Sequence, residues 1–130
     1  MVSVAAPVLV VDDDAVSCRL MVEMLVADGW AAIGTTDPGD AVERLLEQRY
    51  ALLVCDLHMP DMQGTDLAAA VVRRHPGMPV LVVSAHPDAE AMLEARALGV
   101  GFLTKPFIAE AFLAVVRGLA GGQREGRSVA

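Results

Sequence analysis

The chain lacks several features that define other classes of protein. It has only two cysteines, Cys18 and Cys55, and we expect both to be small buried hydrophobic residues rather than part of a disulfide or a metal site. No uninterrupted apolar run approaches the roughly 18 residues that a membrane span requires. The opening residues lack the basic start of a signal peptide. We therefore expect a cytoplasmic protein that makes no contact with a membrane.

Positive charge is also scarce. The formal net charge of −7 argues against direct binding of nucleic acid or of an anionic membrane. Nine of the ten basic residues are arginines, which leaves Lys105 as the only lysine. A compact ammonium group differs chemically from a planar guanidinium, so Lys105 is a candidate for a specific task.

Apolar residues are abundant, at 55% of the 130 residues, and they occur in short runs. These runs predict strands at residues 8–11, 30–34, 52–56, 79–84 and 101–104. Helical spacing of apolar residues predicts helices at 15–27, from 38 to about Leu46, and at 66–75, 88–98 and 108–119. Residues 60–64 are expected to form a loop. Alternating buried strands and amphipathic helices predict a single α/β domain, an open parallel sheet with helices on both faces.

Polar residues stand where the predicted strands end. Asp12 and Asp13 follow the first strand, Asp56 ends the third, Ser84 ends the fourth and Lys105 follows the fifth. Such sheets bind ligands outside the carboxyl ends of their strands, so these residues are expected at one edge.

This combination of residues suits phosphoryl chemistry. Three neighbouring carboxylates repel one another unless a cation lies between them, and Mg²⁺ (or Mn²⁺) suits such a site. A carboxylate such as Asp56 can then act as nucleophile toward phosphorus and form an aspartyl phosphate. Lys105 can neutralise the incoming phosphoryl group, and the Ser84 hydroxyl can donate to one of its oxygens.

Four segments together carry a family resemblance. They are Val-Val-Asp12-Asp13-Asp14, Asp56-Leu-His-Met-Pro60, Val-Ser84-Ala85 and Phe102-Leu-Thr-Lys105-Pro106-Phe107. In this order and spacing, they resemble the receiver domain of two-component response regulators, the CheY-like superfamily. The resemblance implies a flavodoxin-like (βα)5 fold, a doubly wound five-stranded parallel sheet with strand order 2-1-3-4-5. It assigns residues 1–119 to the receiver domain and leaves 120–130 as a flexible tail or linker.

The resemblance also implies roles for individual residues. Asp56 would be the phosphoacceptor, and Asp13 a direct ligand of Mg²⁺. Asp12 would hold metal-bound water, and the backbone carbonyl of His58 would be a further ligand. Asp14 is expected only to cap the following helix.

Further positions match the part of the family motif that binds phosphate and switches conformation. Ser84 and Lys105 would hold the phosphoryl group, and the small Ala85 would leave it accessible. Phe102 would move inward on phosphorylation, although it could equally be an ordinary core residue. The bond between Lys105 and Pro106 is expected to be cis.

His58 and His86 follow Asp56 and Ser84 by two residues each. They could tune dephosphorylation or make it depend on pH, since the unperturbed pKa of histidine is about 6.5. They could equally be two solvated loop residues.

The implied partners follow from the same resemblance. A histidine kinase or a histidine phosphotransfer domain would donate the phosphoryl group, docking on the helix around Val16, Ser17 and Leu20 and on the loop after Pro106. The signal would leave through the surface of residues 88–119 to an unknown output partner. The chain could be a monomer or a phosphorylation-dependent dimer, and it would be a switch rather than an enzyme.

Other interpretations remain open at this stage. The chain could be the receiver piece of a hybrid kinase, or of a regulator whose DNA-binding or enzymatic output is missing here. A haloacid-dehalogenase-type phosphatase also forms an aspartyl phosphate, but its motif needs an aspartate where this chain has His58. A flavodoxin-like module that binds a nucleotide or a flavin should carry a phosphate loop after the first strand, where this chain has three aspartates.

Overall fold

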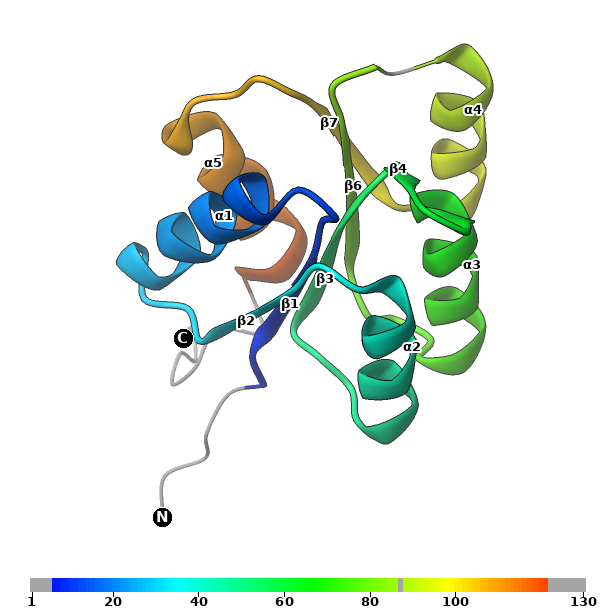
Figure 1. Cartoon of the computed structure of the whole chain (residues 1–130), viewed down its shortest axis with the longest axis horizontal. Helices are drawn as coiled ribbons and strands as arrows, with labels where there is room; N and C mark the ends of the chain where they lie inside the picture. Colours follow the sequence, from blue (N-terminus) through cyan, green and yellow to red (C-terminus); the bar gives the residue numbers. More distant parts are fainter. Residues whose placement is uncertain (1–5, 87, 122–130) are drawn as a thin grey trace.

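A five-stranded parallel sheet forms the centre of the molecule (Figure 1). The computed structural model describes residues 6–86 and 88–121. The strands are β1 (Val8–Val11), β2 (Ala32–Thr35), β3 (Leu52–Asp56), β6 (Val80–Ser84) and β7 (Gly101–Thr104). They lie in the order β2-β1-β3-β6-β7, and every neighbouring pair is parallel. Because β6 and β7 are the fourth and fifth strands of this sheet, the predicted order 2-1-3-4-5 is confirmed.

Five helices cover the two faces of the sheet. They are α1 (Ala15–Ala27), α2 (Pro38–Glu47), α3 (Gly64–Arg74), α4 (Ala89–Leu98) and α5 (Ala109–Ala120). Helices α1 and α5 lie on one face, and α2, α3 and α4 lie on the other (Figure 1). In the described residues, no helix has the length and apolar character needed to cross a membrane.

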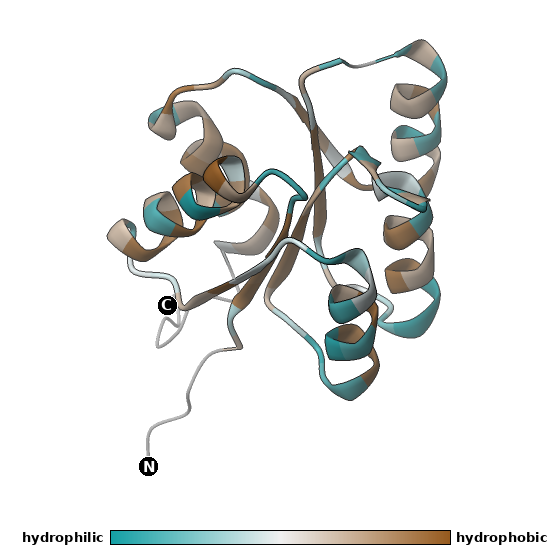
Figure 2. Cartoon of the chain, viewed as in Figure 1, coloured by the Kyte–Doolittle hydropathy of each residue, from teal (hydrophilic) through white to brown (hydrophobic). Residues whose placement is uncertain are grey.

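The three central strands explain why apolar runs dominate the sequence. All four residues of β1, all five of β6 and the first four of β3 are buried. Successive side chains of a strand point to opposite faces, so Leu9 and Leu53 belong to the core under α2, α3 and α4, whereas Val10 and Val54 belong to the core under α1 and α5. Both faces are therefore buried, and the strands read as continuous brown bands in Figure 2.

The second strand begins later than the sequence predicts. We expected residues 30–34, but β2 covers Ala32–Thr35. The Trp30 N–H donates to the carbonyl of Leu25 at 3.0 Å, and its indole Nε1 donates to Asp28 at 3.1 Å. Trp30 is buried because it closes the end of α1, so its apolar character was wrongly interpreted as the start of a strand.

The segment after β3 is more ordered than the predicted loop. β4 (His58–Met59) and β5 (Met62–Gln63) pair antiparallel as a short hairpin, with Asp61 at a φ of 66° in its turn. Helix α3 begins at Gly64, two residues earlier than predicted. The reason is a hydrogen bond of 3.1 Å from the Gln63 N–H to the Asp66 carboxylate, which caps the first turn.

The last helix continues slightly beyond its predicted end. Ala120, which the sequence assigns to the tail, is the final residue of α5 and is buried. The rest of the predicted tail, from residue 122 to 130, lies outside the described residues.

Gly64 allows α3 to start directly beside the end of β3. Its N–H donates to the carbonyl of Leu57 at 2.7 Å. A Cβ at this position would collide with the backbone carbonyl of Asp56 and would lie 3.1 Å from the Cα of Leu57. Backbone atoms cannot move aside as a flexible side chain can, so only glycine fits against this stretch.

We therefore expect Gly64→Ala to lower the free energy of unfolding by about 1–3 kcal/mol, the usual cost of overpacking a filled site. Urea denaturation followed by circular dichroism measures the change. The matched control is Gly118→Ala, because a Cβ on that exposed glycine of α5 meets nothing within 4 Å. The control should gain about 0.5–1 kcal/mol from helix propensity. Equal stability of Gly64→Ala and wild type would contradict the assigned close approach.

Candidate functional site

The register of the sheet brings the predicted site residues together. Val11 pairs with Cys55, so Asp12 and Asp56 leave neighbouring strands at the same level. Asp56 in turn pairs with Val83, and Ser84 pairs with Thr104, which directly precedes Lys105. Residues separated by up to 93 positions in sequence therefore meet at one edge of the sheet.

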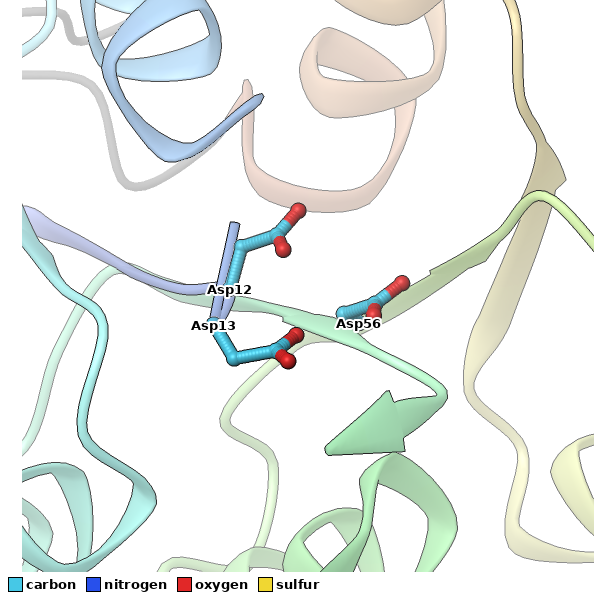
Figure 3. Close-up of side chains that lie close together, drawn as sticks. All are labelled: Asp12, Asp13 and Asp56. Atoms are coloured by element: carbon cyan, nitrogen blue, oxygen red, sulfur yellow. The ribbon is translucent and has the colours of Figure 1, made fainter. Parts of the chain in front are cut away.

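Three carboxylates form the centre of this edge. Asp12 is fully buried, Asp13 is exposed and the Asp56 side chain is 13% exposed. One oxygen from each carboxylate lies within 4.8 Å of the others, and Figure 3 shows the three side chains gathered at the end of the sheet. Carboxylate oxygens in an open cluster are the donors that Mg²⁺ prefers, so the residues present fit this ion.

Lys105 is the cation that the structure places beside the cluster. Its Nζ donates to Asp12 Oδ2 at 2.7 Å and lies 3.5 Å from Asp56 Oδ1. It also donates to the Ser17 hydroxyl at 2.9 Å. From the sequence, Ser17 is expected only as part of a docking surface. No local signal in the sequence marks this contact, because it joins residues that are 88 positions apart.

Burial and charge change the acidity of two groups here. Burial is the largest cause that raises the pKa of Asp56, Lys105 opposes it, and the charges of Asp12 and Asp13 raise it further. For Lys105, burial alone would lower the pKa. The hydrogen bond to Asp12 and the charges of Asp12 and Asp56 outweigh burial, so the pKa is raised and the ammonium form is stabilised.

The three consecutive aspartates have different local surroundings. Asp14 caps α1, since its Oδ1 accepts hydrogen bonds from the N–H of Val16 at 3.0 Å and of Ser17 at 3.5 Å. Asp12 Oδ1 accepts the Asp14 N–H at 3.0 Å, which leaves Oδ2 for Lys105. Asp12 and Asp13 therefore belong to the acidic cluster, and Asp14 belongs to the helix.

Ser84 and Lys105 are joined through the backbone. The Ser84 carbonyl accepts the Lys105 N–H at 2.8 Å. The buried Ser84 hydroxyl accepts the His86 N–H at 3.0 Å, while Ala85 is exposed. The peptide bond between Lys105 and Pro106 is cis.

His58 and His86 lie at the rim of the site. Both are exposed, and His58 Nε2 lies 3.3 Å from the backbone carbonyl of His86. The imidazole of His58 thus links the segment after β3 to the segment after β6. A tuning role for either side chain, and a ligand role for the His58 carbonyl, stay predictions.

Phe102 on β7 is half-buried. It packs against the core under α2, α3 and α4. This position agrees with an ordinary core residue as well as with a movable one, so the switch role stays a prediction.

A groove runs between α1 and the segment that follows Lys105. Its volume is about 410 Å³, and its lining includes Val16, Ser17, Leu20, Met24, Lys105 and Phe107. Val16 and Leu20 are 56% and 48% exposed, and both line this groove, so they form an exposed apolar surface beside the site. The groove therefore combines an apolar floor with an opening to the lysine of the site.

Curated proteins with related sequences are response regulators. The response regulator protein FleR of Pseudomonas aeruginosa is 32% identical over 123 residues, which are 94% of this chain and 26% of FleR. The DNA-binding transcriptional regulator NtrC of Escherichia coli K12 is 35% identical over 121 residues, 91% of this chain and 26% of NtrC. The chain thus spans about a quarter of the length of these two relatives.

Solved structures share the fold. A response regulator receiver protein from Pseudomonas putida has a TM-score of 0.81 and 31% identity, covering 90% of this chain and 99% of its own. The beryllofluoride-activated NtrC4 receiver domain, a dimer, has a TM-score of 0.83 and 25% identity, covering 90% and 98%. A CheY-like receiver domain protein from Methanospirillum hungatei JF-1, at 21% identity and a TM-score of 0.86 over 92% and 97% of the two chains, has the same fold.

The family model described as the response regulator receiver domain matches residues 8–117, nearly all of the described chain. That span runs from β1 into α5 and includes every residue of the acidic cluster together with Lys105 and Ser84. The chain therefore belongs to the family of response regulator receiver domains.

Proposed function

We propose that this receiver domain accepts a phosphoryl group on Asp56 and acts as a switch in a two-component system. The observation that carries the proposal is the arrangement of Lys105 against Asp12 and Asp56, at 2.7 Å and 3.5 Å, beside a third carboxylate. One cation next to three acids leaves negative charge uncompensated, which favours a divalent ion. It also places a positive group where phosphoryl oxygens would arrive.

In the transfer, a carboxylate oxygen of Asp56 attacks phosphorus and an O–P bond forms. The N–P bond of a phosphohistidine breaks, its electron pair returns to the ring nitrogen, and the ring takes up a proton from solvent to leave as neutral imidazole. With acetyl phosphate as donor, acetate leaves instead. Hydrolysis later restores the carboxylate, as water attacks phosphorus and inorganic phosphate departs.

The residues of the acidic cluster would hold Mg²⁺ in this reaction. Asp13 and Asp56 would be direct ligands together with the His58 carbonyl, and Asp12 would act through metal-bound water. When bound, the ion supplies positive charge against the phosphoryl oxygens and lowers the repulsion among the carboxylates. The chemistry of the three carboxylates supports this assignment.

The chain's own residues would stabilise the phosphoryl group on its other sides. The Lys105 ammonium would move from the Asp56 carboxylate toward a phosphoryl oxygen, which then carries the negative charge. The buried Ser84 hydroxyl would turn toward the phosphoryl group, releasing the His86 N–H that it now accepts. Phe102 would then enter the space beside Ser84, as a population shift between two states.

The groove along α1 is the proposed docking surface for the phosphodonor. A histidine kinase or a histidine phosphotransfer domain would cover Val16 and Leu20, whose exposure supports an apolar contact, and would bring its phosphohistidine past Lys105 to Asp56. We place this exchange in the cytoplasm, where the sequence predicts the chain to be.

The output surface is proposed on α4, β7 and α5. Met92 and Leu93 on α4 are 48% and 65% exposed, and Ile108 before α5 is 67% exposed. These side chains would contact an output partner or a second copy of the domain, and the similar NtrC4 receiver domain is a dimer. The longer relative NtrC is a DNA-binding transcriptional regulator, so control of a linked or separate output module is the proposed consequence.

Phosphorylation of the purified chain tests the proposal. Incubation with acetyl phosphate and Mg²⁺ should add one phosphoryl group, about 80 Da, because the proposal assigns a single aspartyl acceptor. Intact-mass spectrometry measures the adduct. It should be lost without Mg²⁺ and in Asp56→Ala.

The control is Asp61→Asn, which changes an exposed carboxylate of the hairpin turn outside the acidic cluster. This variant should be phosphorylated like wild type. An unmodified wild-type chain, with acetyl phosphate and with phosphohistidine donors alike, would overturn the proposed function.

Removing the Asp56 charge should stabilise the metal-free domain. Burial and the neighbouring carboxylates hold the pKa of Asp56 above its unfolded value, so the ionised group costs stability above the folded pKa and costs nothing below the unfolded pKa. At neutral pH without Mg²⁺, we expect Asp56→Asn to raise the Tm by roughly 4 °C, equivalent to about 1 kcal/mol.

Scanning calorimetry measures this effect. The advantage should shrink as the pH approaches about 4, where carboxyl groups protonate. Added Mg²⁺ should stabilise wild type more than Asp56→Asn, because the variant has lost a ligand. A lower Tm for metal-free Asp56→Asn than for wild type at neutral pH would contradict the charge balance described here.

A further inference from the structure

The ammonium of Lys105 has a third partner that the phosphoacceptor chemistry does not require. An ammonium group has three N–H donors. In this site, they face Asp12 Oδ2 at 2.7 Å, the Ser17 hydroxyl at 2.9 Å and Asp56 Oδ1 at 3.5 Å. Two partners are carboxylates at the ends of strands, whereas Ser17 is a neutral group on a helix.

Ser17 is held firmly enough to position a neighbour. It is half-buried in the first turn of α1, and its backbone N–H faces the capping carboxylate of Asp14. The helix N-terminus therefore fixes the hydroxyl relative to the sheet edge. Lys105 itself sits on a flexible four-carbon stem, which needs such an anchor to keep one orientation.

The distances suggest what the anchor does. Lys105 is closer to Asp12 and Ser17 than to Asp56. Two of the three N–H groups are engaged at short distance. The third is left to face Asp56, at a distance longer than that of a tight ion pair. Without Ser17, the ammonium would be anchored at Asp12 alone and could swing toward water or toward Asp56.

We propose that Ser17 is a positioning residue that holds the Lys105 ammonium on Asp12, so that its remaining N–H is aimed at Asp56 and at the phosphoryl group that Asp56 receives. This inference rests on the proposed function for its consequence in phosphoryl transfer. Its structural part, the anchoring of the ammonium, can be tested without any phosphorylation or metal.

The first test uses the fact that Lys105 is the only lysine of the chain. Its side chain therefore gives the single lysine ammonium resonance in a ¹H–¹⁵N spectrum of the metal-free protein. We expect slowed exchange with water in wild type, and exchange faster by roughly threefold or more in Ser17→Ala, because one hydrogen bond to the charged group is gone. Ser17→Thr keeps a hydroxyl and should restore the slow exchange.

The second test measures phosphorylation by acetyl phosphate with Mg²⁺. Acetyl phosphate is small, so a change in protein docking on the groove beside Ser17 cannot explain a change in its rate. We expect the rate at saturating donor to fall roughly 3- to 10-fold in Ser17→Ala and to recover in Ser17→Thr. Thermal unfolding of both variants shows whether the fold is intact, and the comparison is made at a temperature where both are folded.

The outcomes separate the two claims. If wild type is phosphorylated and Ser17→Ala matches it in both ammonium exchange and rate, the inference about Ser17 is overturned while the proposed function stands. If Ser17→Thr behaves like Ser17→Ala, the hydroxyl is not the active feature and the inference also fails. If wild type is never phosphorylated, the proposed function fails, and the exchange measurement alone decides whether Ser17 anchors Lys105.

Discussion

The ion pair between Lys105 and Asp12 is the interaction on which the site depends. It joins the segment after β7 to the segment after β1, past the ends of β3 and β6, and it places a cation next to Asp56. Asp12 is fully buried, so its charge would be costly without this partner. Lys105 in turn needs Asp12, because burial alone would lower the pKa of Lys105 and disfavour its ammonium form. The pair still leaves the cluster of three carboxylates with excess negative charge, and that excess favours the binding of a divalent ion.

The fold serves this pair by fixing the ends of five parallel strands. Buried strands such as β1 and β3 cannot slip by one residue, because a slip would exchange the two faces of the core. Asp12 and Asp56 therefore leave the sheet at a defined level. Gly64 adds a second constraint, because it lets α3 start against the carbonyl of Asp56 itself. The position of Asp56 is thus set from both the strand and the helix that follows it.

Much of the fold and of the candidate site could be predicted because the decisive signals are local. The run from Leu52 to Asp56 combines a buried strand with a charge at its end. The ends of four strands in this chain carry the polar residues that together make up the family motif. The failures concern signals that local sequence does not carry. Trp30 was predicted to start a strand because its side chain is apolar. The turn that ends α1 buries such a side chain just as a strand does. The hairpin of β4 and β5 depends on the left-handed conformation of Asp61. The proline and glycine of this stretch predict a turn, but they do not predict that conformation.

Ser17 shows a different limit of sequence reasoning. A serine in a first helical turn is an ordinary residue, and its relation to Lys105, 88 residues away, exists only after the sheet has formed. His58 is similar, since its contact with the His86 carbonyl joins the hairpin of β4 and β5 to the segment after β6, 28 residues away in the sequence. Contacts of this kind decide how the residues of the family motif are positioned, and the motif itself does not predict these contacts.

We propose that one edge of the sheet holds a phosphoryl group on Asp56, between the acidic cluster and Lys105. A crystal structure of the chain with Mg²⁺ and beryllofluoride, a phosphoryl mimic, is the decisive experiment. We expect beryllium bonded to an Asp56 carboxylate oxygen, fluorine atoms within hydrogen-bond distance of Lys105 and Ser84, and Mg²⁺ on Asp13 and Asp56. Beryllofluoride bound elsewhere, or a metal ion held away from Asp56, would contradict it.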